Sequence, residues 1–180
     1  MFESLEGLRG TGKSTVAPLL AAAREAVLVA TVPAMYQPLR REIDRKDNAE
    51  ARLCFYLSAL FTATDEIQQR LSGGIPVVVE SYFARCLATH EAFGARTIVT
   101  LPPGLPRPTA YWLVCAEQER KRRLAARVKP ASRWDALGED AADRMISAYR
   151  RFHALPVDTT GRTPEQVVQS ILAITPQGGS

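Results

Sequence analysis

The chain has 180 residues, of which 46% are hydrophobic and 23% charged, and its net charge is +4. These values are ordinary for a soluble globular protein, so we expect one domain whose core needs no metal or disulfide. The charge suits anionic ligands but is too small to identify a nucleic-acid-binding protein.

The three cysteines, Cys54, Cys86 and Cys115, are widely spaced and form no CxxC pair. This pattern argues against a disulfide framework and a zinc site, and we interpret all three as small core residues. No apolar segment follows a basic start, and every apolar run is far shorter than the ~20 residues of a membrane span. A cytoplasmic location is therefore the expectation.

The hydrophobic pattern predicts strands that alternate with helices. A short strand at residues 2–5 runs into a glycine-rich turn, and further strands are expected at residues 26–31, 75–80, 110–115 and 155–160. Helices are expected at residues 13–23, 39–46, 49–71, 83–92, 117–127, 140–152 and 164–174, with a bend at Pro18. Residues 101–108 read as a proline-rich loop and residues 128–140 as an irregular segment. This order predicts one α/β domain at residues 1–175 with a parallel sheet, and a flexible tail at residues 176–180.

The first turn, GLRGTGKS at residues 7–14, matches GxxxxGK[ST] in full. In such a turn a strand ends and feeds a helix whose free N–H groups point at anionic oxygens. The glycines permit close backbone approach, the lysine reaches the β- and γ-phosphates, and the hydroxyl ligates Mg²⁺. We therefore predict a site for ATP and Mg²⁺ made by Gly7, Gly10, Thr11, Gly12, Lys13, Ser14 and Thr15.

A P-loop serves kinases, GTPases and motor ATPases alike. The chain is too short for the additional modules of a motor, and no NKxD-type guanine-recognition motif follows the P-loop. The DxxG at residues 158–161 comes after every other landmark, so we interpret it as a strand end and turn. These observations favour a kinase.

The segment EGLRGTGKST at residues 6–15 resembles the FEGLDGSGKST opening of the thymidylate kinases. PRPTAYWLV at residues 106–114 is similar to the prolines before that family's fourth strand, and RLAAR at residues 123–127 to the entry of its lid. VVVESYFARCLA at residues 77–88 lies where the family has its DRY segment, and it also resembles the ERS motif of deoxynucleoside kinases. The resemblance implies a three-layer α/β/α P-loop domain, with a parallel sheet of about five strands in the order 2-3-1-4-5 and a basic lid at about residues 123–139.

The departures from the family pattern fall on the side of the phosphate acceptor. Arg9 stands where thymidylate kinases carry an acid that touches the acceptor sugar. The family's REP motif becomes TVP at residues 31–33, its ADR arginine falls near Leu60, and its DR pair becomes Glu80 and Ser81. We expect a thymidylate-kinase-like scaffold whose acceptor is not dTMP.

Glu80 closes a β-branched strand, so we expect its carboxylate at the carboxyl edge of the sheet, where ligands bind in this architecture. Two roles stay open for it: orienting metal-bound water together with Ser14, or taking a proton from an acceptor hydroxyl. The purely structural alternative is a partner for a neighbouring helix N-terminus.

A basic run extends from residue 120 to residue 133. Arg123 and Arg127 are four residues apart and share a helix face, and Arg133 follows in the expected loop. We predict that these three arginines close over the phosphates and neutralise transition-state charge. A nucleic-acid patch is the rival interpretation, but it would need interleaved aromatic residues, and only Trp134 is near.

The acceptor-side candidates are Arg9, Tyr82, Arg85, Tyr36 and Phe55, with Tyr56 and His90 beside them. Arginines would hold an anionic acceptor, and aromatic rings would stack on a flat one, although aromatic residues at helical spacing more often pack in a core.

The sequence thus favours a phosphotransferase that moves the γ-phosphoryl group of ATP to a small nucleotide-like acceptor, in the manner of a nucleoside monophosphate kinase. A kinase acting on a hydroxyl with Glu80 as base and a non-catalytic nucleotide-binding regulator are the alternatives. We expect a small-molecule partner, no nucleic acid and no membrane, and a homodimer, since the apolar helix at residues 49–71 offers a face for self-association.

Overall fold

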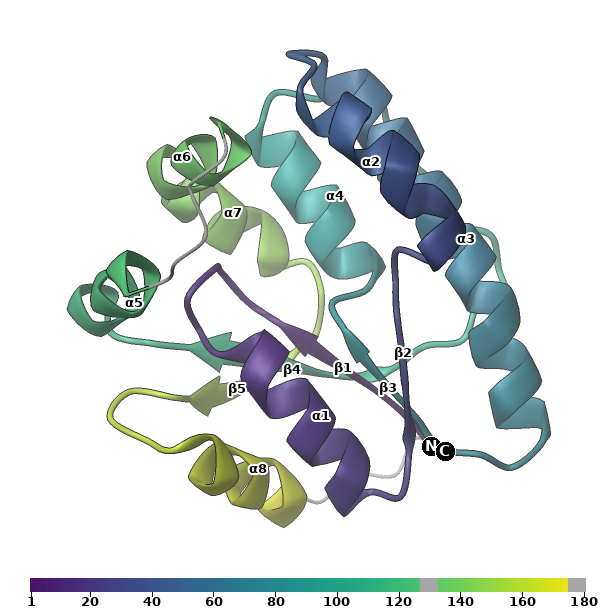
Figure 1. Ribbon diagram of the computed structural model, residues 1–180, viewed down its shortest axis with the longest axis vertical. Coiled ribbons are helices and arrows are strands. Elements are labelled where there is room, and N and C mark those ends of the chain that lie inside the picture. The colour runs from purple at the N-terminus through teal and green to yellow at the C-terminus, as the bar shows by residue number, and fades with distance from the viewer. Residues whose placement is uncertain (127–132, 175–180) are drawn as a thin grey trace.

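A sheet of five parallel strands forms the centre of the molecule (Figure 1). The computed structural model describes residues 1–126 and 133–174. The strands lie in the order β2-β3-β1-β4-β5, as predicted. Their bounds are β1 Phe2–Glu6, β2 Val27–Val29, β3 Val77–Glu80, β4 Thr109–Val114 and β5 Leu155–Asp158.

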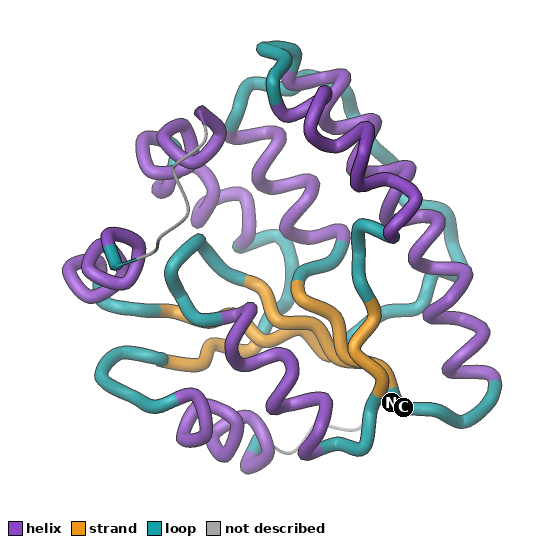
Figure 2. The backbone as a smooth tube through the Cα atoms, in the orientation of Figure 1, coloured by secondary structure: helices purple, strands orange, loops and turns teal. Residues whose placement is uncertain are grey.

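Helices cover both faces of the sheet (Figure 2). Helices α1 (Lys13–Ala23) and α8 (Pro164–Ala173) pack on one face, and α3 (Ala49–Ser72), α4 (Phe83–Ala92) and α7 (Ala142–Tyr149) lie over the other. The remaining helices are η1 Ala34–Tyr36, α2 Gln37–Asp44, α5 Glu117–Ala125 and α6 Arg133–Asp140. Within the described ranges, no helix is long and apolar enough to cross a membrane.

The β3 strand shows why a continuous β-branched run occupies the centre of the sheet. Val78 packs in the core on the α1 and α8 side, whereas Val77 and Val79 pack against α3 and α4 on the other. All three side chains are fully buried, because a parallel strand covered on both faces leaves neither set of alternating side chains in water. The strand ends at Glu80, whose side chain is exposed.

The end of β5 is the turn expected at the DxxG motif. β5 stops at Asp158, and the carboxylate of Asp158 accepts hydrogen bonds from the backbone N–H of Thr160 at 2.9 Å and from its hydroxyl at 2.7 Å. This local bonding is the Asx-turn chemistry that ends a strand.

Two expectations from the sequence are wrong. Residues 133–140 form helix α6 where an irregular segment was predicted, because contacts with distant helices stabilise it. Cys54 lies exposed on α3, whereas the sequence placed all three cysteines in the core.

Candidate functional site

The P-loop joins β1 to α1 and contains glycines at positions where a side chain would not fit. Gly7 has φ of 137°, and a Cβ there would lie 2.6 Å from the carbonyl oxygen of Leu113 on β4. Gly10 has φ of 82°, and its Cβ would lie 2.9 Å from Cγ of Arg120. Both positions therefore require glycine for conformation and for space.

The Lys13 side chain is hydrogen-bonded to the backbone of the P-loop. Its ammonium group donates to the carbonyl oxygens of Gly7 at 2.8 Å and Leu8 at 2.7 Å, and the Thr11 hydroxyl donates to Leu8 O at 2.9 Å. Lys13 is 5% exposed, so its charge lies within the loop next to the space that the loop encloses.

That space is a cavity of about 120 Å³, here named the P-loop cavity. It is bounded by Arg9, Gly10, Gly12, Lys13, Ser14, Glu80 and Arg85. The backbone N–H groups of Gly10, Thr11 and Gly12 have no hydrogen-bond partner among the described residues. Unpaired N–H groups at a helix N-terminus, beside a buried ammonium group, fit the phosphates of a nucleoside triphosphate. Thr15 lies exposed in the first turn of α1.

A magnesium ion also fits this set of residues. The Ser14 side chain is exposed and faces the P-loop cavity, and the Glu80 carboxylate borders the same space. Across residues 1–126 and 133–174 no cluster of three His, Cys, Asp or Glu side chains could hold a metal by itself. Mg²⁺ is usually bound by one or two protein oxygens, which Ser14 and Glu80 could provide, together with water and substrate phosphates.

A second cavity, of about 510 Å³, opens beside the first and runs along α4; we name it the α4 cavity. The ends of β2 and β3 and the helices α2, α3 and α4 enclose it. Its polar side chains include Gln37, Arg40, Arg52, Tyr56, Glu80, Tyr82, Arg85 and His90. Glu80 and Arg85 belong to both cavities, so the two spaces meet at these side chains.

The junction of the cavities is tied to the P-loop. Arg85 Nη1 donates to Gly7 O at 3.1 Å, which fixes a cation between the two spaces. The Glu80 side chain makes no hydrogen bond or ion pair with any described residue, so its carboxylate is open to a ligand. Burial raises the pKa of the Cys86 thiol to about 12, so this neighbour stays protonated and is no nucleophile.

Glu6, the last residue of β1, is a buried acid beneath this junction that the sequence did not single out. Its Oε1 accepts the backbone N–H of Tyr82 at 2.8 Å, and its Oε2 has no partner of normal geometry in the described part of the chain. Complete burial raises the pKa of Glu6, while the Tyr82 N–H and the charges of Arg85 and Lys13 oppose that effect. The signal available in the sequence was an acid at the end of a buried strand, directly before a P-loop.

At its other end the α4 cavity contains a polar network that the sequence did not reveal. Arg52 donates to Asp44 Oδ1 at 3.0 Å and to His90 Nε2 at 2.9 Å, and Tyr56 OH donates to the Asp44 carboxylate at 3.2 Å. His90 Nδ1 donates to Cys86 O at 2.7 Å, which fixes the ring as the tautomer whose Nε2 accepts from Arg52. Burial and the Arg52 charge lower the pKa of His90 to about 4, so the ring is neutral at pH 7.

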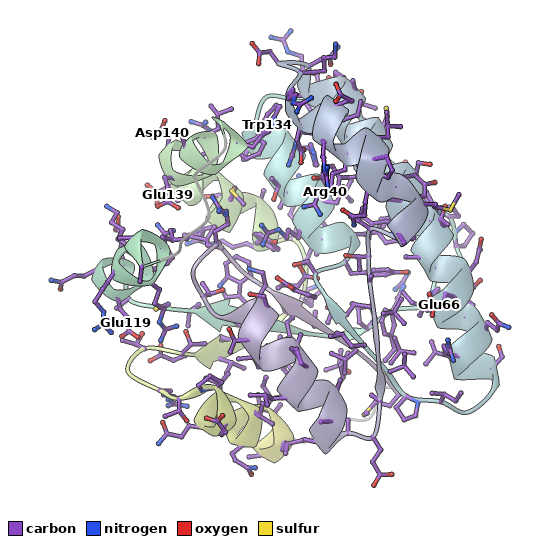
Figure 3. The ribbon with its side chains drawn as sticks, viewed as in Figure 1. Arg40, Glu66, Glu119, Trp134, Glu139 and Asp140 are labelled. Atoms are coloured by element: carbon purple, nitrogen blue, oxygen red, sulfur yellow. The ribbon has the colours of Figure 1, made fainter. Side chains whose placement is uncertain are left out.

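Helix α6 reaches both sides of the site. Trp134 donates from its indole nitrogen to Asp44 O at 2.8 Å, and Glu139 makes two hydrogen bonds with the guanidinium of Arg120, at 2.6 and 2.7 Å. Arg120 is 4% exposed and also donates to Arg9 O at 3.3 Å, so α6 is linked through it to the P-loop. Figure 3 shows Glu139 on the side of α6 that lies toward α5, and Trp134 toward α2.

Of the three arginines predicted to close over the phosphates, the structure describes the side-chain contacts of Arg123. Arg123 donates to Thr159 O at 2.7 Å and pairs with Glu119, and its Nη1 lies 3.9 Å from where a Cβ on Gly12 would be. Arg127 lies outside the described residues. Arg133 begins α6, and the structure does not describe its side chain.

The acceptor-side candidates divide into two groups. Arg9 borders the P-loop cavity, Tyr82 borders the α4 cavity and Arg85 borders both. The Tyr82 hydroxyl is bonded to Thr64 Oγ1 at 2.9 Å. Tyr36 and Phe55 border neither cavity: the Tyr36 hydroxyl bonds to side chains of α3, and Phe55 is 7% exposed.

No protein-family model matches the sequence, and no curated protein matches it. A solved structure of thymidylate kinase from Candida albicans aligns with 95% of this chain and 88% of its own, with a TM-score of 0.75 and 16% sequence identity. The chain has the thymidylate kinase fold. At this identity the likeness concerns the fold alone; that enzyme is described as having broad substrate specificity.

Proposed function

We propose that this chain transfers the γ-phosphoryl group of ATP to a small nucleotide-like acceptor, in the manner of a nucleoside monophosphate kinase and without specificity for dTMP. The observation that carries the proposal is the junction of the P-loop cavity and the α4 cavity at Glu80 and Arg85. A donor phosphate in one space faces an acceptor in the other, which is the positioning that phosphoryl transfer needs.

The donor side of the proposal depends on Lys13 and the P-loop backbone. The Lys13 ammonium group is held at the loop, where it meets the β- and γ-phosphates of a bound triphosphate. The unpaired N–H groups of Gly10, Thr11 and Gly12 supply further donors. Mg²⁺, when bound by Ser14 and Glu80, supplies charge neutralisation at the donor phosphates.

On the acceptor side we assign Arg85 the main charge role. Its guanidinium lies between the cavities and is anchored on Gly7 O, so it is in place before the acceptor arrives. A cation fixed in advance at the reacting phosphates stabilises the charge of the transition state without reorganisation. Arg123, which lies close to Gly12, is the second candidate for this role.

A kinase acting on a hydroxyl is the alternative, and one observation favours it. The Glu80 carboxylate is exposed and has no ion-pair partner among the described residues, as a general base that takes a hydroxyl proton requires. In that reaction the acceptor oxygen forms a bond to the γ-phosphorus, the bond to ADP breaks, and Glu80 takes the proton.

A coupled ADP-release assay over nucleosides, nucleoside monophosphates and phosphorylated sugars separates these reactions. We expect turnover with an acceptor other than dTMP. If dTMP proves the best acceptor, the interpretation of the departures from the family is wrong. Tight ATP binding with no turnover on any acceptor favours a non-catalytic nucleotide-binding protein.

Lys13→Ala tests the donor site. Removal of the ammonium group is expected to reduce transfer below detection, because charge at the β- and γ-phosphates is lost. Lys121→Ala is the matched control, since Lys121 lies on α5, 62% exposed, paired with Glu117. Wild-type activity in a folded Lys13→Ala variant would mean that ATP is not bound in the P-loop cavity.

A further inference from the structure

The α4 cavity has a near end and a far end. Arg85 lies in the first turn of α4 beside the P-loop, and His90 lies in the last turn. His90 is five positions after Arg85, which is about 7.5 Å along the helix axis. An acceptor whose reacting group lies at Arg85 therefore extends toward the Arg52–His90 pair.

The far end carries an excess of positive charge. Arg40 and Arg52 both face the cavity, and both pair with the single carboxylate of Asp44, at 3.6 and 3.0 Å. His90 is neutral and accepts a hydrogen bond from Arg52, so it does not change this balance. Among the side chains that the structure describes, two guanidinium groups thus share one acid.

Both guanidinium groups have N–H donors that make no hydrogen bond to the described residues. Arg40 uses Nε for Tyr56 OH at 3.1 Å, and among the described residues neither of its terminal nitrogens has a hydrogen-bond partner. Arg52 uses Nε for Asp44 and Nη1 for His90, and its Nη2 has no hydrogen-bond partner in the described ranges. Guanidinium N–H groups are the usual ligands of carboxylates and phosphates.

The aromatic rings at the far end contact arginine side chains. The Arg52 guanidinium lies 4.6 Å from the ring centres of both Tyr56 and Trp134, so it stacks on both rings. The Tyr56 ring also meets Arg40 at 5.8 Å and His90 at 5.5 Å. These ring contacts hold the Arg52 guanidinium in place.

We infer that Arg40 and Arg52 bind a second anionic group on the acceptor, a carboxylate or a phosphate at the end opposite the group that receives the phosphoryl. The acceptor class is then a small phosphorylated molecule with an anionic group at each end. This inference deepens the proposed function and rests on it for the identity of the reacting end.

Matched ligand pairs test the inference by binding alone. One pair is ribose 5-phosphate and ribose 1,5-bisphosphate, and the other is glucitol 6-phosphate and 6-phosphogluconate. Within each pair the second member adds one anionic group at the far end. Calorimetric titration of the full-length chain measures the dissociation constants. In at least one pair, the member with two anionic groups is expected to bind at least about tenfold more tightly. A factor of this size corresponds to one charge-assisted hydrogen bond.

Arg40→Gln tests whether Arg40 is the source of the preference for a second anionic group. The variant is expected to lose the preference within the pair while binding the singly anionic member as before. Arg45→Gln is the matched control, because Arg45 lies next to the end of α2, is 72% exposed and pairs with Glu42. Arg85→Gln is expected to weaken both members of a pair equally, since it acts at the near end.

Equal binding within both pairs overturns the inference, as does tighter binding of the member with the neutral end. A preference that Arg40→Gln leaves intact overturns it as well. The ADP-release assay distinguishes a failure of this inference from a failure of the proposed function. Turnover together with equal binding within both pairs contradicts the inference alone, and a preference for the second anion without turnover on any acceptor contradicts the kinase proposal alone.

Discussion

His90 is the residue whose protonation most directly disturbs the far end of the α4 cavity. Its Nδ1 already donates to Cys86 O, so a second proton must go to Nε2, where it breaks the bond from Arg52 and places two cations together. The neutral ring is therefore part of the folded structure, in agreement with a pKa lowered to about 4.

This lowered pKa predicts a loss of stability in mild acid. The unfolded chain binds a proton at His90 below about pH 6.5, and the folded protein resists it until about pH 4. The stabilisation is complete above pH 6.5 and falls as the pH falls through this window, by about 2 kcal/mol between pH 7 and pH 5.

Urea unfolding of wild type and His90→Gln at both pH values measures the contribution. The variant is expected to lose this part of the pH dependence, whereas His153→Gln, at the exposed second histidine, keeps it. An unchanged pH dependence in His90→Gln would contradict the neutral-ring assignment.

Glu6 predicts a pH dependence of opposite sign. Because burial raises its pKa, the folded state holds the proton more tightly than the unfolded chain, and stability declines as the pH rises above about 4.5 through the folded pKa. The stability of Glu6→Gln relative to wild type is therefore expected to increase between pH 5 and pH 8 in urea unfolding. A constant difference would mean that Glu6 ionises without cost.

At the scale of elements, α6 is the segment that links the two sides of the site. Arg120 is almost completely buried, and Glu139 of α6 is the acid that pairs with its guanidinium. Glu139→Gln is expected to destabilise the protein by about 2 kcal/mol, because it weakens two charge-assisted hydrogen bonds. Thermal unfolding against Asp140→Asn, an exposed acid on the same helix, measures this effect. Equal stability of the two variants would show that α6 does not depend on Arg120.

The helical conformation of α6 could not be predicted from the sequence. The segment VKPASRWDALGED contains a proline, a glycine and many charges, which is typical of an irregular chain. Its last eight residues are helical, and its contacts come from Asp44, Arg52 and Arg120, which are distant in sequence. Local propensity contains no information about such partners.

Arg52 was missed for a related reason. A single arginine on a long helix reads as part of a solvated face. Its role appears only when the end of α2, the end of α4 and the start of α6 come together around it. By contrast, the P-loop turn between β1 and α1 was predicted, because its geometry is set by residues adjacent in sequence. The binding roles of Lys13 and the P-loop glycines stay predictions.

At the scale of the whole molecule, the alternation of strands and helices predicted a parallel sheet, and the structure confirms the strand order. The alternation is a strong signal because every strand is followed by helices that must pack back on the sheet. Self-association through α3 stays a prediction.

The central claim is that phosphoryl transfer takes place where the P-loop cavity meets the α4 cavity. Arg85→Gln tests this most directly, with ATP and the best acceptor from the ADP-release assay. We predict that kcat/KM for the acceptor falls about 10²-fold or more while the affinity for ATP changes less than about threefold, because Arg85 stabilises charge at the transferred group. Unchanged kcat/KM in a folded Arg85→Gln variant would contradict the claim.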